Sequence, residues 1–215
     1  MKTTGGEALV KSLEAHAVDT VFGIPGTHNL AAYDALINAI DIKHITARHE
    51  QGAAFMADGY ARASGKEGIC FCTSGPAALN AIASLGTSYA DSVPVLCVIS
   101  QIPTDFIGKE KGIIHECRDQ LACFDPVVKW SATAKTVEEI SAHVAEAFYQ
   151  MRNGRPRPVV LEIPCNILDA SAEVEIAEER SVETAAPTTE QIAQVAELLK
   201  QAETPIIWAG GGVNS

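Results

Sequence analysis

The chain has 215 residues, of which 47% are hydrophobic and 20% charged, and its formal net charge is −11. This length allows one domain, or one domain and part of another, with a core that needs no disulfides. So acidic a surface repels phosphate backbones and argues against nucleic acid as a partner. We see no signal-peptide pattern and no run of about 18 apolar residues, so we expect no membrane partner and a cytoplasmic location.

Helical and strand patterns alternate along the first 165 residues. Apolar stripes with helical spacing predict five helices, over residues 6–17, 30–40, 50–63, 77–89 and 137–151. Short apolar runs predict six strands, over residues 20–24, 42–46, 68–72, 93–100, 127–132 and 158–163. This alternation predicts an α/β fold, a six-stranded parallel sheet with helices on both faces. Within it, Asn29 is expected to cap the second helix, whose apolar stripe is Leu30, Tyr33, Leu36, Ile37 and Ile40.

Ligands of such sheets bind beyond the carboxyl ends of the strands. That rule selects four segments as the functional edge before any family is considered. They are residues 25–29, 47–50, 73–76 and 100–116.

The composition changes after Pro164. Residues 165–185 carry six acids and one base without a helical or strand period, and we interpret residues 166–187 as an acidic linker. Beyond it, Thr188 or Thr189 caps a helix that runs to Gln201, and residues 205–209 are strand-like. One helix and one strand cannot bury a core of their own. We therefore expect a first domain over residues 1–165 and, over residues 188–215, the truncated start of a second α/β domain.

The six cysteines show no disulfide or metal-binding pattern. Cys70, Cys72 and Cys97 lie in apolar runs typical of buried strands, where cysteine behaves as a small hydrophobic residue. Because no C-x-x-C pair exists, neither a zinc site nor a redox dithiol is indicated, and we predict no metal ligands in this chain. A reducing compartment fits this cysteine usage.

Glu50 opens the third predicted helix, directly after a strand. An acid there gains from the helix dipole, and this capping effect is its plain structural explanation. The helix also carries small residues on several faces, which predicts close packing and a buried interface. An acid at the rim of such an interface is costly unless it has a partner or a function.

The segment from Arg48 to Arg62 resembles the glutamate-bearing helix of the thiamine-diphosphate enzymes of the acetolactate synthase and 2-oxo acid decarboxylase superfamily. Further segments, in the same order as in that family, are similar to its first strand and loop, its T-S-G-P turn, its fourth strand entry and the opening of its central domain. They are residues 21–26, 72–80, 89–95 and 209–213. The resemblance spans nearly the whole chain and implies that residues 1–165 are the N-terminal, pyrimidine-binding domain.

The resemblance implies that Glu50 is the catalytic acid. In this family a Glu carboxyl hydrogen-bonds the aminopyrimidine ring of thiamine diphosphate and thereby promotes deprotonation of the cofactor's C2 carbon. Other residues match positions that line the pyrimidine pocket, namely Pro25, Gly26, Thr73, Gly75 and Asn80. For Thr73 and Gly75 a plain strand-to-helix turn is the structural alternative. Ala77 stands where the family usually has Gly, and a positive φ there would strain it.

Three residues are implied to face the substrate, His28, His115 and Glu116. A solvated loop histidine is the alternative for His28. His115 and Glu116 fall where acetolactate synthases carry Phe-Gln, and this departure favours a resemblance to decarboxylases of larger 2-oxo acids, such as the guanidino acid derived from arginine. Glu116 then pairs with a cationic substrate tail, while a structural salt bridge remains open as its alternative.

The resemblance thus implies thiamine-diphosphate-dependent decarboxylation or carboligation of a 2-oxo acid. In relatives the Mg²⁺-binding motif, G-D-G followed by N, lies in a C-terminal domain, and no such motif occurs here, so Mg²⁺ is expected to bind outside this chain. The resemblance also implies a homodimer or homotetramer whose active site is shared between subunits. The alternative is a catalytically inactive regulatory or assembly module of the same fold. A Rossmann dehydrogenase and a serine hydrolase are disfavoured because their G-x-G-x-x-G and G-x-S-x-G motifs are missing.

Overall fold

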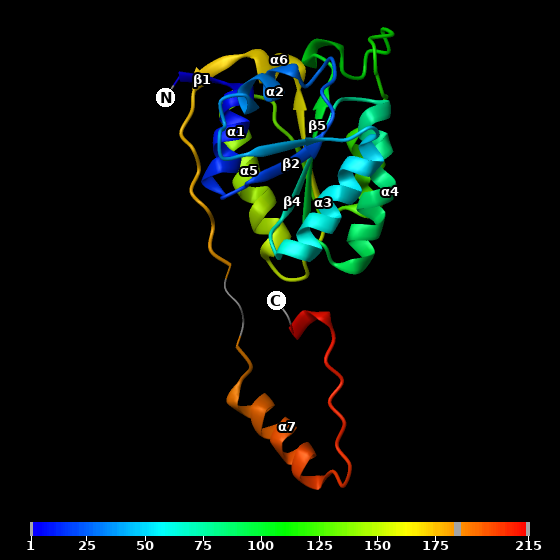
Figure 1. Cartoon of the computed structure of the whole chain (residues 1–215), viewed down its shortest axis with the longest axis vertical. Helices are drawn as coiled ribbons and strands as arrows, with labels where there is room; N and C mark the ends of the chain where they lie inside the picture. Colours follow the sequence, from blue (N-terminus) through cyan, green and yellow to red (C-terminus); the bar gives the residue numbers. More distant parts are fainter. Residues whose placement is uncertain (1, 183–185, 214–215) are drawn as a thin grey trace. The chain divides into compact units, whose positions relative to one another are not determined.

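The computed structural model describes residues 2–182 and 186–213, which belong to two compact units, Met1–Val182 and Glu183–Ser215. A parallel sheet of six strands, in the order β3-β2-β4-β5-β7-β6, forms the centre of the first unit (Figure 1). Its strands are β2 (Thr20–Gly23), β3 (Lys43–Thr46), β4 (Gly68–Cys72), β5 (Val95–Gln101), β6 (Trp130–Thr133) and β7 (Val159–Pro164). The predicted α/β fold and its six parallel strands are confirmed.

Helices cover both faces of the sheet (Figure 1). On one face α1 (Gly5–Ala15), α2 (Leu30–Leu36) and α5 (Val137–Arg152) enclose a core of large side chains that includes Leu13, Phe71 and Phe148. On the other face α3 (Glu50–Ser64) and α4 (Pro76–Asp91) enclose a core rich in alanine. Because side chains alternate along a strand, Ile69 and Phe71 of β4 join the first core while Cys70 and Cys72 join the second.

The second helix departs from the prediction. α2 ends at Leu36, so Ile37 and Ile40 leave the expected stripe and are 77% and 92% exposed. The helix instead buries Ala32, Ala35 and Leu36 against the core. Asn29 is the N-cap residue, but its side chain does not cap the helix.

Residues expected to form the start of an acidic linker belong to the first unit. A short helix, α6 (Cys165–Asp169), is followed by β8 (Ser171–Glu173), which pairs antiparallel with β1 (Lys2–Thr4). Further along, Arg180 forms an ion pair with Glu146 of α5, and Glu179 pairs with Arg152. The β1–β8 pairing and these two ion pairs attach the segment to the rest of the first unit, which extends to Val182 and not to residue 165.

The second unit contains the predicted helix, α7 (Thr189–Gln201), and a 3₁₀ turn, η3 (Gly211–Val213). Thr188 and Gln191 form a reciprocal capping box at the start of α7. The strand expected over residues 205–209 is wrong for this structure, since these residues pair with no strand among the described parts of the chain. A lone extended segment has no neighbour to accept its backbone hydrogen bonds. Two further 3₁₀ turns, η1 (Thr104–Phe106) and η2 (Leu121–Val127), lie in the first unit.

Candidate active site

The carboxyl ends of four neighbouring strands bring the predicted functional segments to one edge of the sheet. β2 pairs in parallel with β3 and β4, with Gly23 opposite both Thr46 and Phe71. β4 in turn pairs in parallel with β5. The loops after these strands therefore begin side by side, and they carry the sequence-predicted residues.

Glu50 is the first residue of α3 and is half-buried. The preceding residue, His49, caps the helix, because its Nδ1 atom accepts a hydrogen bond from the Gln51 N–H at 3.2 Å. Glu50 Oε2 accepts a hydrogen bond from Asn80 Nδ2 of α4 at 2.9 Å. The structure thus joins two of the predicted site residues directly, across the contact between the two helices.

Gly75 shapes the turn between β4 and α4. Its φ is 61°, and a Cβ atom built there would lie 2.3 Å from the carbonyl oxygen of His115. Only glycine fits such a position without strain. Ala77 lies within α4 and does not have a positive φ, so the strain considered for it does not arise.

The loop after β2 rests on this turn. A Cβ atom at Gly26 would lie 2.5 Å from Cγ2 of Thr73, so the loop backbone touches Thr73 directly. The His28 N–H donates to Thr73 Oγ1 at 3.3 Å. Asn29 braces the same loop, accepting from the Gly26 N–H at 2.7 Å and donating to the carbonyl of Ile24 at 3.3 Å. Pro25 is exposed at the start of the loop.

His28 and His115 meet at this edge. The two rings pack edge to face, with centroids 5.9 Å apart, and His28 Nδ1 is hydrogen-bonded to Ser74 Oγ at 2.6 Å. Burial, and then the neighbouring His115, lower the pKa of His28 below its ordinary value of 6.5. His115 has a φ of 65°, a strained conformation for a residue with a side chain, and its buried Nδ1 has no hydrogen-bond partner in the described structure.

Glu116 closes its own loop. Its carboxylate accepts hydrogen bonds from three successive backbone N–H groups, those of Lys111, Gly112 and Ile113, at 3.2, 2.6 and 3.2 Å. The carboxylate of Glu116 therefore stabilises a turn. Its structural role is carried by these backbone hydrogen bonds and not by the salt bridge that the sequence suggested. A contact of Glu116 with substrate stays a prediction.

A buried polar network behind the turn was not anticipated. Glu162 of β7 accepts hydrogen bonds from Gln101 Nε2 at 3.0 Å, Gln120 Nε2 at 2.9 Å and Thr133 Oγ1 at 2.8 Å. Gln120 also donates to the carbonyl of Ser100 and accepts the Gly75 N–H, so it links Glu162 to the turn. Burial raises the pKa of Glu162, against the opposing effect of its hydrogen bonds. The one signal in the sequence was a single acid inside an otherwise apolar strand.

Within the described residues, no helix has both the length and the apolar character needed to cross a membrane. The chain has an open parallel sheet, the class of α/β fold in which ligands bind beyond the carboxyl ends of the strands. Residues 3–123 match the family described as thiamine pyrophosphate enzyme, N-terminal TPP binding domain. The chain belongs to this family, which confirms the resemblance seen in the sequence.

Curated relatives extend the similarity to nearly the whole chain. A protein of Pseudomonas aeruginosa named "Probable 2-ketoarginine decarboxylase" is 43% identical over 215 residues, covering 97% of this chain and 38% of the relative. A "Probable acetolactate synthase large subunit" of Methanocaldococcus jannaschii is 41% identical over 97% of this chain and 36% of its own length. An "Acetolactate synthase isozyme 1 large subunit" of Escherichia coli is 36% identical over 98% of this chain and 37% of its own length. The chain therefore spans less than two fifths of the length of these relatives.

Proposed function

We propose that this chain supplies the glutamate half of a thiamine-diphosphate site, in a protein that decarboxylates a 2-oxo acid or joins it to a second carbonyl compound. The observation that carries the proposal is the pair formed by Glu50 and Asn80 at the carboxyl edge of the parallel sheet. The names of the relatives, which include acetolactate synthases and a 2-ketoarginine decarboxylase, support the substrate class.

The residues at this edge fit the aminopyrimidine half of the cofactor. Glu50 is half-buried, so its carboxylate can be reached, and the Asn80 amide holds one of its oxygens. Gly26 and Gly75 bring two backbone segments to the turn where side chains would not fit. When bound, thiamine diphosphate supplies the carbon nucleophile and the electron sink for decarboxylation.

Each residue has a role that follows from its position. Glu50 binds the pyrimidine ring and exchanges a proton with it, while Asn80 orients the carboxylate for that exchange. Pro25, Gly26, Thr73 and Gly75 form the wall of the pocket. A Glu50→Asp change would shorten the reach of the acid, and Glu50→Gln would remove its exchangeable proton.

His28, His115 and Glu116 are proposed to lie on the substrate side of the site. The lowered pKa of His28 keeps its imidazole neutral near pH 7, so it can accept a proton from a group that approaches it. The unpartnered Nδ1 of His115 offers a polar atom at the same edge. Glu116 lies next to it on a loop that lines an open cavity of about 470 Å³.

Assembly and metal binding complete the proposal. Phe55 and Met56 of α3 are 42% and 43% exposed, which supports a homodimer or homotetramer in which another subunit covers this helix and shares the site. Mg²⁺ is proposed to bind through a C-terminal part of the protein outside this chain. The cysteine usage supports a cytoplasmic location.

The test is C2 hydrogen–deuterium exchange of thiamine diphosphate, followed by proton NMR in the full-length protein with Mg²⁺. Exchange should be far faster than in free cofactor and should slow by orders of magnitude in Glu50→Gln. Asn80→Ala should slow it by roughly tenfold, the effect of losing one orienting hydrogen bond of about 1.4 kcal/mol. Glu14→Gln, at an exposed position on α1, is the matched control and should leave the rate unchanged. Exchange at the rate of free cofactor, or equal rates in the wild type and Glu50→Gln, would favour an inactive regulatory or assembly module.

A further inference from the structure

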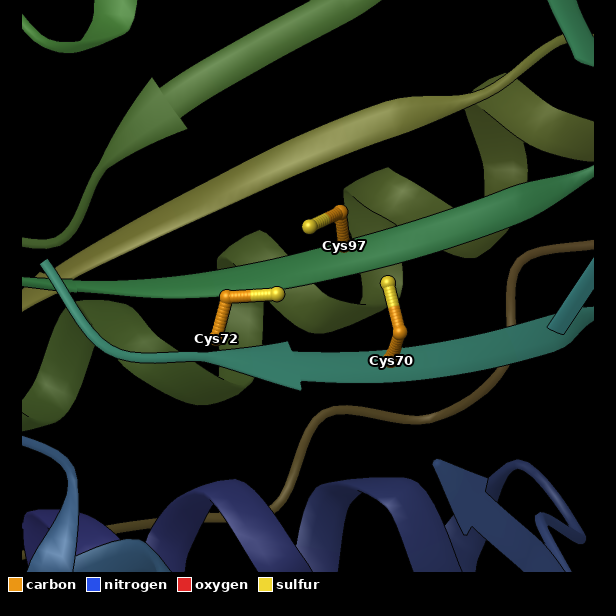
Figure 2. A group of neighbouring side chains, drawn as sticks. All are labelled: Cys70, Cys72 and Cys97. Atoms are coloured by element: carbon orange, nitrogen blue, oxygen red, sulfur yellow. The ribbon is translucent and has the colours of Figure 1, made fainter. Parts of the chain in front are cut away.

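Three of the six cysteines meet in the alanine-rich core under α3 and α4. Cys70 and Cys72 lie two residues apart on β4 and so share one face of the sheet, and Cys97 of β5 lies opposite Cys70 in the parallel register (Figure 2). Their Sγ atoms all lie within 4.8 Å of one another, and all three residues are fully buried. Two adjacent strands at the centre of the sheet thus hold three soft donor atoms in fixed positions.

The spacing suits a single ion among the three sulfurs. A metal–thiolate bond is about 2.3 Å long, so a trigonal centre needs sulfurs about 4.0 Å apart and a linear one about 4.6 Å. The observed spacing, within 4.8 Å, reaches both arrangements with small side-chain rotations. No backbone rearrangement is needed because the strands already set the positions of the donors.

The donor set selects the kind of ion. Among the described residues, no histidine, aspartate, glutamate or further cysteine joins the three thiols. Structural zinc sites require four ligands, and calcium or magnesium require oxygen. Three sulfurs without a fourth ligand instead suit a soft ion of low coordination number, such as Cu(I).

We propose that Cys70, Cys72 and Cys97 form a buried binding site for one soft monovalent metal ion. Each sulfur that becomes a ligand of Cu(I) loses its S–H proton to solvent, because the thiolate is the form of cysteine that binds metal. The positive ion and its thiolates offset one another's charge, since an uncompensated charge in an apolar core is strongly unfavourable. The proposal does not depend on the function proposed above.

The position of the three thiols decides how an ion reaches them. They lie in the core enclosed by α3 and α4 and are 0% exposed. Because all three side chains are sealed from solvent, the ion enters through local opening of the helices above them, and uptake is slow.

The other three cysteines must be removed before the site can be tested, because Cys117, Cys123 and Cys165 are not fully buried and their thiols would compete for added copper. The 215-residue chain carrying serine at these three positions is loaded with Cu(I) without oxygen and in the presence of a competing copper chelator. We expect one copper ion per chain, release of thiol protons on loading, and X-ray absorption that shows three sulfur neighbours at about 2.3 Å. The loaded protein should keep its circular dichroism spectrum and melt at a higher temperature.

Variants distinguish this site from adventitious binding. Cys97→Ala in the same background should lose the ion to the chelator, and Cys72→Ala repeats the test if the first variant does not fold. Val95→Ala truncates another buried side chain of β5 without removing sulfur and should retain the ion. Three outcomes would overturn the proposal. Copper could remain bound in Cys97→Ala, copper could bind only the unfolded chain, or the folded protein could take up no copper.

Discussion

Replacement of Glu162 tests whether the buried network holds the turn at Gly75. In Glu162→Gln, the amide oxygen can take the place of Oε1 and keep the bonds from Gln101 and Gln120, while the amide N–H₂ donates to Thr133 Oγ1. Each partner keeps a hydrogen bond to the side chain, and burial already disfavours the charged carboxylate, so the free energy of unfolding should change by only about 1 kcal/mol or less. The leucine variant behaves differently, because it offers no acceptor.

In Glu162→Leu, the buried amides of Gln101 and Gln120 each lose the acceptor of one N–H group, and the half-buried Thr133 hydroxyl loses its acceptor as well. Each unsatisfied buried donor costs about 1–3 kcal/mol, so the variant should lose about 2–6 kcal/mol of unfolding free energy. Urea denaturation followed by circular dichroism measures both variants, with the exposed Glu14→Leu as control. Equal losses for the glutamine and leucine variants would refute the role of the network.

Three further predictions follow from the site. Gly75→Ala should lose more than about 1 kcal/mol in urea denaturation because of its positive φ and the close His115 carbonyl, whereas Gly59→Ala, within α3 and in open space, should gain about 0.5–1 kcal/mol. NMR titration should place the His28 pKa below 6.5 and move it upward in His115→Ala. Since burial raises the pKa of Glu162, its protonation stabilises the fold fully below its ordinary pKa of 4.5, and this contribution is lost as pH rises through the folded value. We therefore expect the difference in unfolding free energy, wild type minus Glu162→Gln, to fall as pH rises. A difference that rises with pH or stays constant would contradict the raised pKa of Glu162.

The central sheet was predictable because its strands are short, apolar and separated by clear helical periods. β4 and β5 are buried along their whole length and read as continuous apolar runs, as central parallel strands should. Periodicity says less about where an element ends. Ile37 and Ile40 fit the stripe of α2, but the helix stops at Leu36, and nothing in the spacing marks that boundary.

Elements that depend on distant partners escaped prediction. β1 and β8 have three residues each, which is too short for a hydrophobic period to be recognised in the sequence. The two strands pair although they lie near opposite ends of the first unit's sequence. The site shows the same division. The segments that hold Glu50, Thr73 and Gly75 were selected because they follow strands, and the family resemblance suggested their roles. Glu162 and Gln120 lie 42 positions apart and become partners only in the folded sheet. A lone acid between Leu161 and Ile163 is the kind of local inconsistency that marks such a network.

The two faces of the sheet are packed with side chains of different size. The face under α1, α2 and α5 is filled with large side chains, including Leu9, Ile140 and Met151. The other face is filled mainly with small ones on α3 and α4, and a Cβ atom at Gly68 would lie 2.1 Å from the carbonyl oxygen of Ala57, so α3 lies almost directly on the sheet. This close approach lets the side chains of Glu50 and Asn80 meet across two helices. Larger residues in that core would lift the helices and separate Glu50 from Asn80, so the alanines of α3 and α4 keep this pair within hydrogen-bond reach.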